Sequence, residues 1–167
     1  MIRQAYNLIK AHYDGRTAER SGVPLINHID EGLRVLRARN ATQAAMAAYC
    51  LHPLVQRDID LASNNRHLVD FPGHVIVLTM EYRNIANASL AHKVDQCSGP
   101  EAIPLSPLHD VNEMLVADKV QNYKDFRTYH FGSHPRGERL DRYFQMWLAR
   151  LNVTFEEFLE YERMLKR

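Results

Sequence analysis

The sequence has little of what marks the specialised classes of protein. Its 167 residues include two cysteines, seven glycines and seven prolines, which excludes a disulfide-stapled scaffold, a collagen-like chain and a low-complexity segment. The 21 lysines and arginines nearly balance the 20 aspartates and glutamates, so charge gives no reason to expect a nucleic-acid polymer as a partner. No apolar run approaches the roughly 20 residues of a transmembrane helix, and we expect no membrane partner.

These absences favour an ordinary folded protein of the cytoplasm. Cys50 and Cys97 match no spacing of zinc ligands, and so few thiols favour a reducing compartment. Residues 2–13 have the pattern of an amphipathic helix and lack the apolar centre of a secretory signal. With 46% hydrophobic and 25% charged residues, we expect one cytoplasmic domain over residues 1–167. The sequence leaves open whether several copies form a homo-oligomer.

Apolar residues recur with a helical period through most of the chain. They predict helices over residues 2–13, 28–38, 42–51, 75–90, 111–126, 140–151 and 155–165. The segment 75–78 alone also suits a β-strand, but the residues after it favour a helix. Thr154, followed three residues later by Glu157, predicts a capped start for the last helix. Because we find no repeat and no linker, we expect an all-α fold.

Two polar residues lie on an apolar stripe of the predicted helix 111–126. Val111, Leu115, Asp118 and Asn122 follow one another at spacings of four, three and four, which places them on one helix face. A buried carboxylate costs several kcal/mol unless it is paired or coordinates a metal. Asp118 is therefore a candidate metal ligand or catalytic residue. A salt bridge to a neighbouring arginine, or a helix cap, is the alternative.

Nine histidines are the unusual feature of the composition, and two of them lie at helix ends. His28 begins one predicted helix, and His52 follows the apolar helix 42–51. Each alone is commonly a hydrogen-bonded structural histidine. Together with Asp118 they form a plausible metal triad, since neutral imidazole and carboxylate suit zinc, manganese or iron.

Four segments around these residues resemble one known family. They are AYNLIKAHYDG (5–15), RSGVPLINH (20–28), AAYCLH (47–52) and LVADKVQN (115–122). In order and spacing they resemble the HD-domain phosphohydrolases, most closely the Rel/Spo branch, which hydrolyses guanosine tetraphosphate alarmones. The resemblance spans about residues 5–126 and leaves 127–167 as additional C-terminal helices.

The resemblance implies a fold, a cofactor and an activity. The fold would be a single HD-domain helical bundle, and the activity a metal-dependent hydrolysis of a nucleotide or nucleotide pyrophosphate, with an alarmone 3'-pyrophosphohydrolase as the named form. The divalent metal would be Mn, Fe or Zn. Its expected ligands are His28, His52 and Asp118. The residues expected to contact the substrate or its phosphates are Asn122, Arg20, Lys119 and Arg83.

The sequence departs from this family at several positions. Pro53 follows His52 where the family has a metal-binding aspartate directly after this histidine, and proline cannot ligate a metal. Gln56 and Arg57 stand where the Rel/Spo branch has a Glu-Asp pair that helps to position water. Glu19 stands where the branch has an arginine near the base.

Three acidic residues are candidates to replace the missing carboxylates. Asp58 and Asp60 lie just past Pro53, and either could act as a substitute ligand, although a solvated acidic loop is the plainer interpretation. Glu81 lies within one helical turn of Arg83, so the pair could position water and clamp a phosphate, or form a surface ion pair. The single His-Asp dipeptide, at 109–110, precedes a predicted helix, and we expect Asp110 to be its N-cap.

Two other functions stay open at this point. The chain could be a catalytically inactive HD domain that binds a nucleotide or a partner protein, which Pro53 favours. It could also be a purely structural helical domain, in which case the positions of the histidines and Asp118 would be coincidental.

Overall fold

The computed structural model describes residues 1–19, 21–91 and 99–166. Within these ranges the chain forms eight α-helices, three short 3-10 helices and no β-strand. The α-helices are α1 (Ile2–His12), α2 (Ile26–Ala38), α3 (Gln43–Leu51), α4 (Asp58–Asn64), α5 (Gly73–Ala88), α7 (His109–Tyr129), α8 (Gly137–Arg150) and α9 (Phe155–Leu165); the 3-10 helices are η1 (His52–Leu54), η2 (Asn65–Asp70) and η3 (Pro100–Ala102). The predicted all-α class is confirmed.

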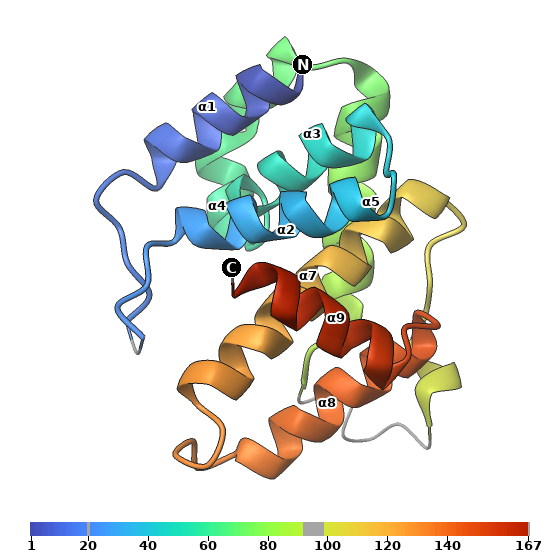
Figure 1. Ribbon diagram of the computed structural model, residues 1–167. Helices are drawn as coiled ribbons and strands as arrows, with labels where there is room; N and C mark the ends of the chain where they lie inside the picture. The colour runs from blue at the N-terminus through green and yellow to red at the C-terminus, as the bar shows by residue number, and fades with distance from the viewer. Residues whose placement is uncertain (20, 92–98, 167) are drawn as a thin grey trace.

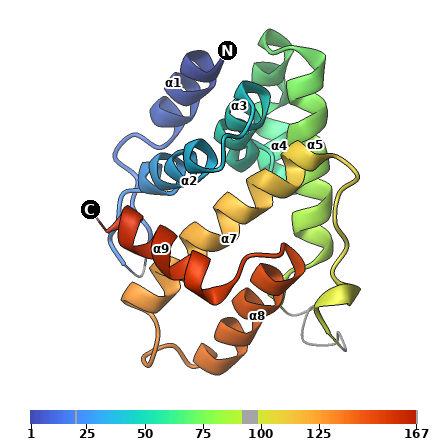
Figure 2. The ribbon, with the colours of Figure 1, turned by 45° about the vertical axis from the view of Figure 1, so that its right-hand side comes forward.

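Helix α7 runs through the middle of the molecule and is the longest helix (Figures 1 and 2). It packs against α2, α3 and α5 on one side and against α8 and α9 on the other. Most of its residues are buried, polar ones included. A helix surrounded by neighbours needs apolar residues on nearly all sides, so the few buried polar groups on α7 are costly unless they interact with one another.

The N-terminal half packs closely because two helices carry small residues. Ala45, Ala47 and Ala48 are fully buried on α3, between α1 and α5. A Cβ atom at Gly32 of α2 would lie 2.1 Å from the hydroxyl of Tyr49. Only glycine therefore allows the Tyr49 ring to pack against α2.

The structure confirms some predicted helix boundaries and corrects one. The Thr154 side chain accepts a hydrogen bond from the Glu157 amide, as predicted for the start of α9. Residues 75–78 lie within α5. The expectation for Asp110 was wrong. Leu108 is the N-cap of α7, and Asp110 lies in the first turn, where its carboxylate accepts a hydrogen bond of 2.6 Å from Thr42.

Helix α3 ends at Leu51, and the chain continues as the 3-10 helix η1 with Pro53 near its start. His52 is the first residue of this turn, and its ring contacts that of Tyr82 on α5. Among the described helices none is both long and apolar enough to cross a membrane.

Candidate metal centre

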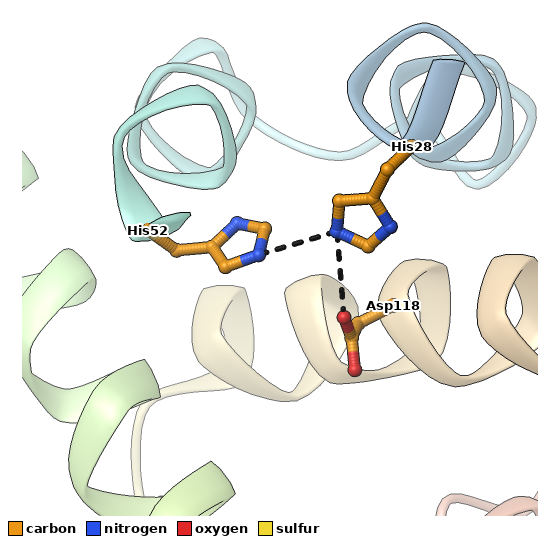
Figure 3. A group of neighbouring side chains, drawn as sticks. All are labelled: His28, His52 and Asp118. Atoms are coloured by element: carbon orange, nitrogen blue, oxygen red, sulfur yellow. Dashed lines mark hydrogen bonds and ion pairs between the residues drawn. The ribbon is translucent and has the colours of Figure 1, made fainter. Parts of the chain in front are cut away.

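Three predicted ligands from distant parts of the chain meet in the structure. His28 lies in the first turn of α2, His52 directly after α3, and Asp118 in the middle of α7 (Figure 3). The two imidazole Nε2 atoms are 3.3 Å apart, and His28 Nε2 is 3.6 Å from Asp118 Oδ1. His52 and Asp118 are buried and His28 is partly buried. The sequence prediction that these three side chains converge is therefore confirmed as geometry.

Backbone and aromatic contacts fix the orientation of His52. Its Nδ1 lies 2.6 Å from the backbone carbonyl of Tyr49, which can only accept a hydrogen bond. Nδ1 therefore carries the proton, and the Nε2 lone pair faces the other two ligands. The rings of Tyr49 and Tyr82 pack against the imidazole at centroid distances of 4.9 and 4.7 Å. Burial, followed by the nearby His28, lowers the pKa of His52 to about 3, so the imidazole is neutral at physiological pH.

His28 is oriented in the same way by a side chain. Its Nδ1 lies 2.6 Å from Gln121 Oε1. The Tyr49 hydroxyl lies 3.3 Å from the His28 carbonyl and 3.4 Å from its Nε2. With Nδ1 donating to the Gln121 oxygen, His28 also presents an Nε2 lone pair to the centre of the group.

The donor atoms suit a divalent metal. Two imidazole lone pairs and a carboxylate oxygen face one another, all within 4.8 Å. Ligand atoms bound at about 2.0–2.2 Å to one tetrahedral or octahedral ion lie about 3.0–3.5 Å apart, close to the 3.3 and 3.6 Å that separate His28 Nε2 from His52 Nε2 and from Asp118 Oδ1. The other nitrogen of each ring bonds to an acceptor outside the group, the usual arrangement for histidines that bind metal. The residues present therefore fit Zn²⁺, Mn²⁺ or Fe²⁺.

Two neighbours on α7 hold Asp118. Lys119 Nζ donates to Oδ2 at 2.8 Å, and Asn122 Nδ2 donates to Oδ1 at 2.9 Å. Burial alone would raise the pKa of Asp118, but the Lys119 ammonium, ahead of the two imidazoles, lowers it to about 2. Lys119 is itself buried, with Nζ 5.0 Å from the centre of the Trp147 ring. Asp118 therefore stays ionised.

The three residues lie in a cleft of about 470 Å³. Lys119 and Asn122, which the sequence marked as substrate contacts, line it beside Asp118. The lining also includes three of the four residues at which the sequence departs from the family that it resembles, namely Pro53, Gln56 and Arg57. From α1 and the residues after it come His12 and Arg16, and from α4 comes Asp60.

Three other predicted site residues are not brought to this cleft. Arg83 donates to the Val55 carbonyl at 2.7 Å and forms an ion pair with Asp58, whose side chain is 98% exposed. Glu81 accepts a hydrogen bond of 3.0 Å from Ser106. None of Arg83, Asp58 and Glu81 lines the cleft. Arg20, the remaining predicted substrate contact, lies outside the described residues.

The side chains that orient the two histidines and lie beside Asp118 were not predicted from the sequence. Tyr49 lies three residues before His52, and Gln121 lies three residues after Asp118, so both share a helix face with a ligand. That spacing was the available signal. It was weak, because a tyrosine or a glutamine at such a position does not by itself indicate a metal site.

The neutral His52 should make the stability of the metal-free protein depend on pH. In the unfolded chain this imidazole titrates near its ordinary value of 6.5, whereas the folded protein holds its pKa at about 3. Between these values the unfolded state binds the extra proton, so stability is lost as the pH falls, by up to about 1.4 kcal/mol per pH unit.

Urea unfolding in the presence of a chelator, at about pH 7 and about pH 5, measures this loss. The His52→Ala variant should lose clearly less stability than the wild type over the same interval. Equal losses in both proteins would show that His52 is not held neutral by the fold.

Comparison of the chain with protein-family models, with curated proteins and with solved structures finds no match in any of the three.

Proposed function

We propose that the chain is a metal-dependent phosphohydrolase of the HD-domain type that acts on a nucleotide or a nucleotide pyrophosphate. One observation carries the proposal. His28, His52 and Asp118 direct two imidazole lone pairs and one carboxylate oxygen at each other in a cleft large enough for a small ligand. Burying polar and charged side chains costs free energy, and a bound cation would offset that cost for this group.

The charges of the cleft support a phosphate-bearing substrate. Its described lining contains three cationic side chains, from Arg16, Arg57 and Lys119, and three carboxylates, from Asp60, Asp118 and Asp125. These charges cancel while the histidines are neutral. A divalent ion at the centre would give the cleft a net charge of about +2, which favours an anionic ligand.

A bound divalent ion would supply two effects, polarising a phosphoryl oxygen and lowering the pKa of a water. The other tasks fall to the residues of the chain. Lys119 keeps Asp118 ionised, and Asn122 holds the Asp118 Oδ1 that faces His28. We assign the role of the acidic residue beside the substrate to Asp60 in place of Asp58 and Glu81, because Asp60 lines the cleft.

The second candidate is an HD domain that binds a nucleotide without cleaving it. Pro53 favours it, because this residue lines the cleft next to His52, where the resembling family has a metal-binding carboxylate. Asp60 also favours it, since its carboxylate is held by Arg57 in two hydrogen bonds of 2.7 Å. A carboxylate held in this way is a weak base.

Metal-dependent turnover separates the two candidates. We expect protein loaded with Mn²⁺, Zn²⁺ or Fe²⁺ to release phosphate or pyrophosphate from at least one member of a nucleotide panel that begins with guanosine tetraphosphate. His28→Ala should lose at least about 100-fold in rate. His109→Ala is the matched control, because that imidazole is 84% exposed at the far end of α7.

Saturable nucleotide binding without turnover, under every metal tested, would overturn the hydrolase and support the binding module. Neither binding nor turnover would contradict both candidates.

A further inference from the structure

We propose that Gln121 is a positioning residue that fixes the tautomer of His28 and so keeps the site ready for a cation. The proposal rests on the metal centre proposed above and deepens it. It concerns a side chain for which the sequence suggested no role.

Gln121 is almost fully buried on α7, with 1% of its surface exposed. Its Oε1 lies 2.6 Å from His28 Nδ1. Its Nε2 donates to two carboxylates, Asp125 Oδ2 at 2.7 Å and Glu31 Oε2 at 3.2 Å. Each end of the amide therefore has partners of the matching kind.

The two carboxylates prevent the amide from turning over. A flipped Gln121 would direct its oxygen at Glu31 and Asp125, and its amide hydrogens at a ring nitrogen that now donates. Lys124 holds both carboxylates in place, with Nζ 2.8 Å from Glu31 Oε1 and 2.5 Å from Asp125 Oδ1. Since the carboxylates can only accept, the amide has one satisfied orientation, and Oε1 must face His28.

This orientation decides where His28 carries its proton. Opposite an acceptor at 2.6 Å, Nδ1 is the protonated nitrogen of the neutral ring, which leaves a lone pair on Nε2. The other tautomer would place an Nε2 proton toward His52 Nε2 at 3.3 Å and Asp118 Oδ1 at 3.6 Å. That proton would form a hydrogen bond between the expected ligands, and it would occupy the Nε2 lone pair that a metal needs. Gln121 disfavours this closed arrangement.

Two substitutions separate positioning from simple support of the core. Gln121→Leu removes the acceptor and should let His28 populate the Nε2–H tautomer. Gln121→Glu keeps an acceptor opposite Nδ1 but sets a third carboxyl group beside Glu31 and Asp125. A role in packing alone predicts that metal affinity follows stability in both variants. The positioning role predicts that the two rankings differ. Gln121→Glu should be less stable than Gln121→Leu but should bind metal more tightly.

The first readout is the tautomer of His28 in metal-free protein, from ¹⁵N NMR of the imidazole rings at a pH above their ordinary pKa. We expect Nδ1–H in the wild type and in Gln121→Glu, and a mixture with Nε2–H in Gln121→Leu. The second readout is Zn²⁺ affinity. We expect a loss of about 10- to 100-fold in Gln121→Leu and of less than about threefold in Gln121→Glu. Thr79→Val, which removes a buried hydrogen bond on α5, is the control.

An unchanged tautomer and unchanged Zn²⁺ affinity in Gln121→Leu would overturn the positioning role. Equal losses of affinity in both variants would do the same. Failure of the wild type to bind Zn²⁺ would instead overturn the metal centre itself, and the tautomer measurement, which needs no metal, keeps the two failures distinct.

Discussion

Replacing His52 with alanine is expected to abolish metal binding without unfolding the protein. The wild type purified without chelator and supplied with metal should hold about one equivalent of Zn²⁺ or Mn²⁺ per chain, and the variant less than about a tenth. Three protein ligands are the smallest set usual for a catalytic metal, and here one is lost. His52 is also neutral at physiological pH, so its loss leaves no ion unpaired in the core.

Elemental analysis after gel filtration measures the metal directly. His109→Ala, which changes an exposed imidazole on α7, should retain the full equivalent. If His52→Ala retains its metal, the bound ion lies somewhere else and the assignment of the three ligands is wrong.

Replacing Asp118 with asparagine is expected to give the largest loss of stability. Asp118 and Lys119 are both buried, and their ion pair of 2.8 Å neutralises the two charges inside the protein. The same pairing raises the pKa of Lys119 well above its ordinary value. Asparagine leaves the ammonium buried without a counter-ion, which costs about 3–5 kcal/mol.

A second substitution tests whether the unpaired ammonium is the cause. In Asp118→Asn/Lys119→Met the charge is gone, and the methionine can pack against Trp147, over whose ring Lys119 Nζ now lies. We expect the double variant to recover most of the lost free energy of unfolding in urea, yet to bind no metal. A double variant as unstable as Asp118→Asn would contradict the ion-pair explanation.

The helical fold and the three proposed metal ligands were accessible from the sequence for a physical reason. Helix α7 places Val111, Leu115 and Asp118 on one face, so a carboxylate among apolar residues is visible as an irregularity of a periodic pattern. The histidines lie next to helix ends, and donor chemistry grouped them with Asp118 before the resemblance to a known family supported the same set. The structure confirms that the three side chains meet.

Other parts of the site depend on rotations and contacts that no local pattern fixes. Glu81 and Tyr82 are neighbours on α5, and one residue turns a helix by about 100°. Tyr82 packs against His52, whereas Glu81 bonds to Ser106. Because α5 has apolar residues on several sides, the sequence does not determine which face points at the cleft.

The network around Gln121 could not be predicted for a similar reason. Glu31 is 90 residues away from Gln121 in the sequence, and their contact exists only because α2 packs on α7. Asp58 likewise lies outside the cleft, in an ion pair with Arg83 on α5 that joins residues 25 positions apart. Helix type follows from local pattern, but these partners follow from packing.

The most direct test of the metal centre is anomalous diffraction from crystals of the wild-type protein soaked with Mn²⁺ or Zn²⁺. The account predicts one strong peak about 2.0–2.2 Å from His28 Nε2, His52 Nε2 and Asp118 Oδ1. A dominant peak elsewhere, or none at these three atoms at saturating metal, would contradict it.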